Sequence, residues 1–145
     1  MAIRPNLPVG ITTVTPPAVE TLVKTFKVER TDTAAFDAVV LPKYAVVSGV
    51  YVLGNTASNA ATTAVISVGT NPGTTNELLA SFDVKGATGS GYHPAGAAAA
   101  LGIATQMTAD TKFKAIYAET GIASSAGGPW IVKVEYYIPP QGISL

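Results

Sequence analysis

Apolar and polar residues alternate most clearly in the stretch 130–138, near the C-terminal end of the chain. Every second residue there is apolar, which is the period of a β-strand with one face in a core. Gly127-Gly128-Pro129 precedes the stretch and Pro139-Pro140 follows it, and proline cannot donate a hydrogen bond to a neighbouring strand. We therefore expect a central strand here, with these side chains pointing into the core: Trp130, Val132, Val134, Tyr136 and Ile138.

Other stretches have strand character as well, because they alternate with a period of two or are rich in β-branched and aromatic residues. The longest, 44–54, is apolar on both faces, and its Gly49 predicts a β-bulge or a close backbone approach. Asn71-Pro72-Gly73 predicts a tight turn, because proline presets φ and glycine accepts positive φ. With the central strand, the expected strands are 20–30, 36–41, 44–54, 62–69, 78–85, 111–119 and 130–138.

The phase of the alternation assigns inward and outward side chains. In 78–85 it predicts that Leu78, Ala80, Phe82 and Val84 face inward and that Leu79 faces outward. The inward residues expected on the other strands are Leu22, Phe26, Val28, Ala64, Ile66, Val68, Phe113, Ala115 and Tyr117.

Roughly seven or eight short strands with polar turns and no helical period predict an all-β fold: an antiparallel β-sandwich, jelly-roll-like or a related Greek key. The 145 residues suffice for one domain. We place the β-sandwich domain at 20–138, between an extended N-terminal arm at 1–19 and a C-terminal tail at 139–145. The stretch 86–110 is the least regular part, and its alanine run favours one helical turn at 97–101.

The N-terminal arm contains four prolines, which block helix and interior strand and favour extended backbone. Arg4 is its one charged residue, whereas disordered tails are normally polar and charged. Two interpretations follow: a loosely docked terminus, or an arm that lies on a neighbouring subunit. Under the second, the expected contact residues are Ile3, Arg4, Leu7, Val9, Ile11 and Val14.

Charged residues make up only 12% of the chain and apolar residues 48%. Either uncharged polar residues cover the surface, or other subunits cover much of it, and the apolar arm favours the second. The formal net charge is zero and the basic residues do not cluster, so we expect no nucleic-acid partner. We also expect no membrane association and synthesis in a cytoplasm, because no apolar run has the length of a membrane span and the N-terminus lacks the apolar region of a signal peptide.

Residues that could carry catalysis or bind metal are few. The chain has no cysteine and one histidine, His93, which argues against disulfides and against thiolate or histidine metal sites. His93 with Asp83 or Asp110 would complete a Ser-His-Asp arrangement, but no serine lies in a nucleophile motif. The acidic residues are scattered, without the spacing of a glycosidase pair or a calcium loop. We therefore expect no metal, no cofactor and no enzymatic activity.

Three aromatic residues, Trp130, Tyr136 and Tyr137, admit two interpretations. They could form a platform on which a sugar stacks, or they could pack in the core. Trp130 and Tyr136 have the inward phase, which favours core packing.

Short blocks of the sequence carry a family resemblance: 50–54, 57–60, 62–69, 82–86, 117–121 and 124–130. They resemble the small structural proteins of tailed-bacteriophage virions, and among these the head decoration, or cement, type. The resemblance spans about residues 20–138. It implies a jelly-roll-like subunit, often a homotrimer, that sits on the outer surface of the capsid and contacts the major capsid protein. It also implies assembly in the host cytoplasm, with the arm bridging neighbouring capsid subunits.

Two other hypotheses remain open at the level of sequence. One is a phage tail, fibre or receptor-binding module with glycan affinity. The other is a carbohydrate-binding or adhesive domain outside viruses, which would be expected to carry a secretion signal. The resemblance itself transfers no functional residues, because it includes no functional motif.

Overall fold

The computed structural model describes residues 19–86, 91–93 and 106–140, with the backbone alone for 91–93. The expected helical turn at 97–101, the end of the tail at 141–145 and the arm residues Ile3, Arg4, Leu7, Val9, Ile11 and Val14 lie outside the described residues. The regular elements of the described part of the chain are all strands: β1 (Leu22–Val28), β2 (Phe36–Leu41), β3 (Val46–Gly54), β4 (Thr63–Gly69), β5 (Leu79–Asp83), β6 (Gly91–His93), β7 (Thr111–Thr120) and β8 (Trp130–Tyr137).

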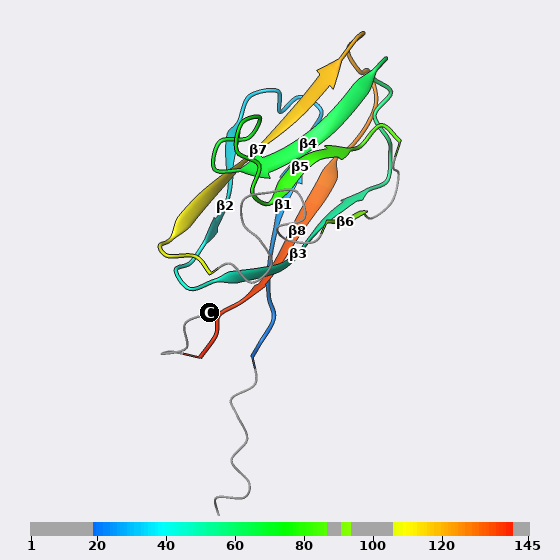
Figure 1. Ribbon diagram of the computed structural model, residues 1–145. Coiled ribbons are helices and arrows are strands. Elements are labelled where there is room, and N and C mark those ends of the chain that lie inside the picture. Colours follow the sequence, from blue (N-terminus) through cyan, green and yellow to red (C-terminus); the bar gives the residue numbers. More distant parts are fainter. Residues whose placement is uncertain (1–18, 87–90, 94–105, 141–145) are drawn as a thin grey trace, which may run out of the picture.

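The strands form two sheets that lie one over the other (Figure 1). The first sheet has the order β1-β8-β3-β6 and the second has the order β2-β7-β4-β5. All neighbouring strands are antiparallel. The prediction of an antiparallel β-sandwich is therefore confirmed, and this strand order is compatible with a jelly roll. The predicted central strand is also confirmed, because β8 lies between β1 and β3.

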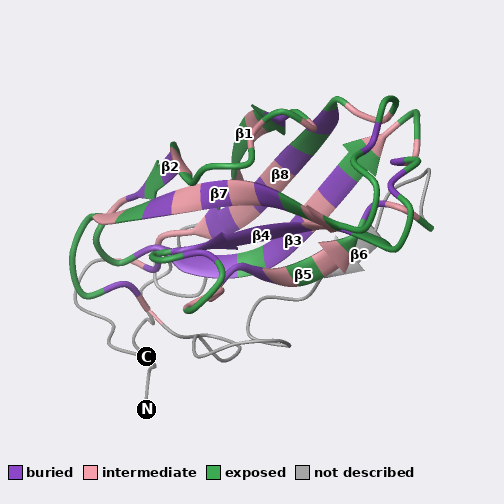
Figure 2. Ribbon diagram, turned by 90° about the horizontal axis from the view of Figure 1, so that it is seen from above, coloured by how far each residue is buried: buried purple, intermediate pink, exposed green. Residues whose placement is uncertain are grey.

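The core lies between the two sheets, as the alternating buried bands of β7 and β8 show (Figure 2). Trp130 at the start of β8 and Tyr117 of β7 are both fully buried, and their rings stack with centroids 5.5 Å apart. This contact joins the central strand of the first sheet to the second sheet. Core packing of Trp130 and Tyr136 is thus confirmed over a sugar-stacking platform.

Two local predictions are confirmed by the backbone. The pairing of β3 with β8 shifts register between Val47 and Gly49, as expected of a bulge at Gly49. In the predicted turn, Thr74 N donates to Asn71 O at 3.0 Å and Gly73 has φ of 97°. Gly73 therefore supplies the left-handed backbone that this turn requires.

The expected outward position of Leu79 is wrong, since Leu79 is 0% exposed. Ile66 of β4 pairs with Phe82 of β5, and Val68 of β4 pairs with Leu79 of β5. Two residues therefore lie between the paired positions on β5 but only one on β4, so β5 contains one extra residue. Ser81, within this bulge, has φ of 51°. The bulge reverses the inward and outward phase, so Leu79 faces the core beside Val68, and a strict period of two does not apply across it.

Candidate interaction surface

A polar cluster surrounds the buried hydroxyl of Tyr117. This hydroxyl donates to Glu119 Oε2 at 2.6 Å and lies 2.8 Å from Ser58 Oγ and 3.3 Å from Ser124 Oγ. Ser124 N donates to Glu119 Oε1 at 3.1 Å. Burial raises the pKa of Tyr117, and the hydrogen bonds from Ser124 and Tyr117 lower the pKa of the Glu119 carboxyl. The cluster therefore anchors the loop 121–129 to β7.

The same loop is tied to its neighbours by Asn59 and Arg30. Asn59 Oδ1 accepts hydrogen bonds from the backbone N–H groups of Ser125 and Ala126, each at 2.9 Å. Arg30 donates a guanidinium N–H to Ser124 O at 3.0 Å. These bonds satisfy backbone groups that loops otherwise leave to solvent, so they hold this end of the sandwich in one conformation.

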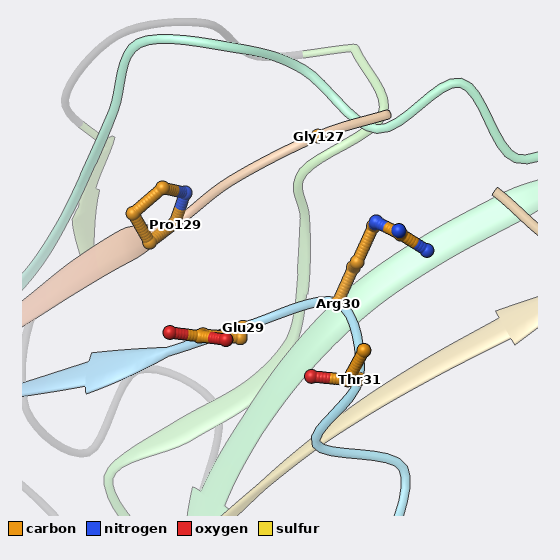
Figure 3. Close-up of a pocket in the computed structure, with 5 residues that line it drawn as sticks. All are labelled: Glu29, Arg30, Thr31, Gly127 and Pro129. Atoms are coloured by element: carbon orange, nitrogen blue, oxygen red, sulfur yellow. The ribbon is translucent and has the colours of Figure 1, made fainter. Parts of the chain in front are cut away.

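An open pocket of about 220 Å³ lies beside this loop (Figure 3). It is lined by Glu29, Arg30, Thr31, Gly127 and Pro129. The Arg30 side chain points away from the Glu29 carboxylate in Figure 3. The two charged groups of the pocket therefore do not converge on one point, as a catalytic acid and base would.

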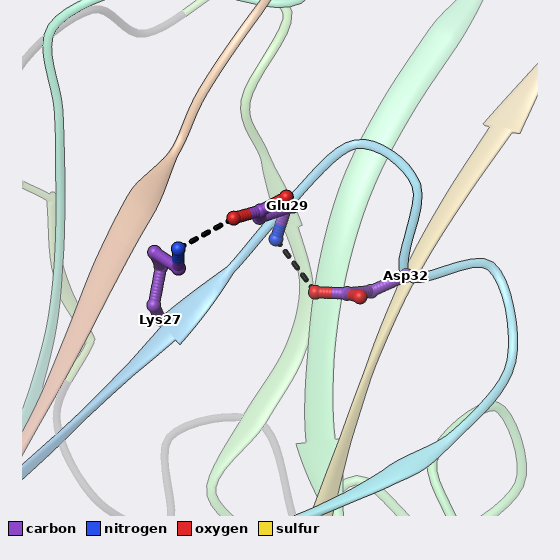
Figure 4. Close-up of polar contacts among 3 residues, drawn as sticks. All are labelled: Lys27, Glu29 and Asp32. Carbon is purple, nitrogen blue, oxygen red and sulfur yellow. Dashed lines mark hydrogen bonds and ion pairs between the residues drawn. The ribbon is translucent and has the colours of Figure 1, made fainter.

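Glu29 instead belongs to the turn that follows β1 (Figure 4). Its carboxylate pairs with Lys27 at 2.5 Å, and this hydrogen bond raises the pKa of Lys27. Asp32 closes the turn: Asp32 Oδ2 accepts from Glu29 N at 2.7 Å, and Asp32 N donates to Glu29 O at 3.0 Å. The acidic residues of this turn therefore have local structural partners.

Other acidic residues also have local roles. Asp37 pairs with Lys112 at 2.9 Å, and the hydrogen bond from Lys112 lowers the pKa of the Asp37 carboxyl. Asp83 Oδ1 accepts from Lys85 N at 2.7 Å after β5, and Asp110 Oδ1 accepts from Lys43 N at 2.8 Å. Asp83 and Asp110, weighed above as partners of His93, are thus engaged by backbone amides.

In the described part of the chain, no group of three or more His, Asp or Glu side chains has an arrangement that could hold a metal ion. Nor do these residues include a helix with the length and apolarity that a membrane span needs. The position of His93 is known from the backbone of β6, which pairs with β3.

The outer face of the first sheet exposes large apolar side chains. Leu53 of β3 lies directly opposite Ile131 of β8, and these side chains are 41% and 38% exposed. Val23 on β1 is 49% exposed. Beside them Lys133 and Glu135 form an ion pair at 2.8 Å, and the hydrogen bond raises the pKa of Lys133. We call these five residues the outer patch; it combines three exposed apolar side chains with one ion pair.

A second apolar surface runs along one border of the sandwich. There β1 and β2, which are edge strands of the two sheets, contact each other (Figure 2). Leu22 and Phe26 of β1 and Phe36 and Ala38 of β2 pack against the core but stay half-buried. We call these four residues the β1–β2 seam. Val28, the last residue of β1, is fully buried, so the two sheets cover the core completely there. At the seam the core is covered only in part, because the four seam residues are half-buried.

The chain was compared with known proteins. No family model matches it, and no curated protein does. Among solved structures, a chain from the capsid asymmetric unit of cyanophage Pam1 is similar at a TM-score of 0.65 and 23% identity, over 94% of this chain and 100% of that one. A chain of the acid-stable capsid of Helicobacter pylori bacteriophage KHP30 is similar at a TM-score of 0.57 and 16% identity, over 83% and 89%.

A third similar chain comes from the capsid of Ralstonia phage GP4, with a TM-score of 0.56 and 21% identity over 91% of this chain and 92% of that one. At these identities the likeness establishes a shared fold. The fold is therefore one that occurs, over nearly the whole length of the chain, in components of phage capsid structures.

Neither apolar surface was identified from the sequence. Alternation assigned Leu22 and Phe26 correctly to the inward side of β1, but it does not reveal that β1 is an edge strand. Edge position depends on which distant strands pair, and pairing is not encoded in the local pattern. The residues singled out from the sequence, those of the arm, remain predictions because they lie outside the described part of the chain.

Proposed function

We propose that this chain is a structural protein of a bacteriophage head, of the decoration or cement type, that binds the outer surface of the capsid. The observation that carries the proposal is the likeness to a chain of the Pam1 capsid asymmetric unit, which spans 94% of this chain and all of that chain. Chains from two further phage capsids have the same fold. The partner in this proposal is the major capsid protein.

The composition and the surface of the sandwich fit a protein that functions by contact. Only 12% of the residues are charged, and the outer patch and the β1–β2 seam expose apolar side chains that another protein surface can cover. The acidic residues described above serve turns, loops and strand pairs. The chemistry of the described residues is thus that of a scaffold with adhesive surfaces.

Stabilisation of the head follows from mass action. A protein that binds only the assembled lattice lowers the free energy of that lattice relative to dissociated subunits. The proline-rich arm suits such binding, because a stiff, extended segment loses less conformational entropy on docking than a flexible one. In the proposal, arm residues Ile3, Arg4, Leu7, Val9, Ile11 and Val14 contact the capsid or a neighbouring subunit, and the sandwich assembles as a homotrimer.

The proposal is tested by adding the purified protein separately to isolated heads that lack it and to isolated tails, and measuring co-sedimentation. We expect saturable binding to heads and none to tails. Deletion of residues 1–17 should lower the occupancy on heads, and unchanged occupancy would refute the role of the arm. Binding to tails or to host glycans, with none to heads, would instead support the receptor-binding alternative and contradict the proposal.

A further inference from the structure

We propose that the segment 9–15 of one copy adds as a further strand to the outer edge of β1 in a second copy and covers the β1–β2 seam there. This inference concerns the association of copies with each other in solution, so it goes beyond binding to the head. It combines an acceptor edge in the described structure with a donor segment in the sequence.

The acceptor is β1 at the border of the first sheet. Among the described residues, β1 pairs with β8 alone, so its other edge presents backbone N–H and C=O groups to a possible partner. Beside this edge, Leu22 and Phe26 are half-buried, whereas Val28 is fully buried. An added strand would pair with the open edge and cover the apolar side chains next to it. Strand addition of this kind takes its affinity from main-chain hydrogen bonds and its specificity from alternate side chains.

The donor is the longest proline-free stretch of the arm. Its sequence, Val9-Gly10-Ile11-Thr12-Thr13-Val14-Thr15, is β-branched at every position except Gly10, which is a strong preference for strand. Proline precedes and follows it, and proline ends a paired strand because it lacks an N–H group. The stretch is seven residues long, and β1 has 7 residues as well. The arm therefore contains one segment that is matched in length to the open edge.

The alternation of the donor fits the two faces of β1. Val9 and Ile11 share a face with Thr13, which would lie toward the seam, and Thr12 would lie on the outer face. One charged residue, Lys24, stands on the inward side of β1. Lys24 is exposed, and its flexible stem can carry the ammonium group past an added strand.

The connection between donor and acceptor favours a second copy over the same chain. Residues 16–21, Pro-Pro-Ala-Val-Glu-Thr, contain no Gly, Asn or Asp, the residues that form hairpin turns. The Pro-Pro pair favours extended backbone and so directs the arm away from its own β1. Extended, these six residues span up to about 20 Å, which is enough to reach an adjacent copy.

The chain has no native cysteine, so introduced cysteines report one contact cleanly. Thr12 is the central residue of the donor and Thr25 that of β1, so the two are opposite each other whether the strands run parallel or antiparallel. A Thr12→Cys protein is mixed with a Thr25→Cys protein under mild oxidation, and the disulfide-linked heterodimer is measured. Matched controls pair Asn6→Cys with Thr25→Cys, and Thr12→Cys with Thr74→Cys, which lies in the distant turn after β4. We expect at least a tenfold higher yield for the first mixture than for either control.

A second measurement compares Ile11→Pro, which disrupts the donor strand, with Asn6→Pro, which adds the same residue outside it. We expect Ile11→Pro to reduce the mass in solution to that of one 14.7 kDa chain and Asn6→Pro to keep the oligomer. The inference is overturned by a heterodimer yield no higher than in the controls, by a wild-type monomer, or by an oligomer that survives Ile11→Pro. A disulfide that forms within one chain carrying both Thr12→Cys and Thr25→Cys, in place of the heterodimer, also overturns it. Binding to heads is measured in a separate experiment. An oligomer that does not bind heads would therefore contradict the proposed function and leave this inference standing.

Discussion

Replacing Tyr117 by Phe tests whether the polar cluster in the sandwich holds the fold together. The substitution removes one buried hydroxyl and keeps the ring, so the stacking on Trp130 at 5.5 Å is retained and no large cavity forms. The Tyr117 hydroxyl donates its single proton to Glu119 Oε2. The Tyr117 oxygen therefore accepts the hydrogen bond from Ser58 Oγ at 2.8 Å. In the variant the Ser58 hydroxyl, in a residue that is only 3% exposed, loses its acceptor.

A buried hydrogen-bond donor without an acceptor costs about 1–3 kcal/mol. For a loss of about 2 kcal/mol and a denaturant dependence of about 2 kcal/mol per molar urea, the unfolding midpoint falls by about 1 M. Trp130, the sole tryptophan, reports the transition by its fluorescence. Tyr44→Phe is the matched control, because Tyr44 is exposed on the surface and its hydroxyl should contribute within about 0.5 kcal/mol.

A double-mutant cycle separates this explanation from a general loss of packing. In a Ser58→Ala background, the donor that Tyr117→Phe would leave unpaired no longer exists, so Tyr117→Phe should cost clearly less than it does in the wild type. Equal costs in both backgrounds would refute the reasoning, as would a Tyr117→Phe midpoint equal to that of the wild type.

Two further predictions concern the same end of the sandwich. The pKa of Glu119 is lower in the folded protein than in the unfolded chain, so its stabilising contribution is present above the unfolded value of about 4.3 and is lost as the pH falls through the folded value. Glu119→Gln should therefore reduce the dependence of the unfolding free energy on pH in that acidic range. An unchanged pH profile of the unfolding free energy would contradict the lowered pKa of Glu119. At Gly54 an added Cβ would lie 2.3 Å from Trp130 Cδ1, so Gly54→Ala should destabilise by about 1–3 kcal/mol in thermal unfolding. In the control Gly86→Ala the added Cβ comes no closer than 3.2 Å to its neighbour, Asp83 Oδ2, so this variant should have little effect, and equal stability of the two variants would show that Trp130 can move.

Most of the regular strands could be predicted from the sequence, because their side chains alternate between positions in the core and positions on the outer face. In β8 and β7, every second residue is buried against the opposite sheet, and the alternation is therefore visible in the residue types. The turn at Asn71-Pro72-Gly73 was also predictable, since its conformation depends on the intrinsic preferences of proline and glycine.

The features that escaped prediction depend on pairing between distant segments. β6, Gly91–His93, has too few residues to show a period and exists through its pairing with β3. The bulge in β5 that turns Leu79 inward is a property of its ladder with β4. The outer patch and the β1–β2 seam emerge only once the strand order is known. Proline density and hydrophobicity predict an arm at 1–19, and its contacts stay a prediction because residues 1–18 lie outside the described part of the chain.

The proposed role on the phage head is tested most directly by the heat stability of heads. Heads prepared without the protein are divided, one half is saturated with it, and the temperature at which the shells disrupt is measured for both. We expect disruption at a clearly higher temperature in the saturated heads, and an intermediate or unchanged temperature when residues 1–17 are deleted. Saturated heads that disrupt at the same temperature as bare heads would contradict a function as a capsid-stabilising decoration protein.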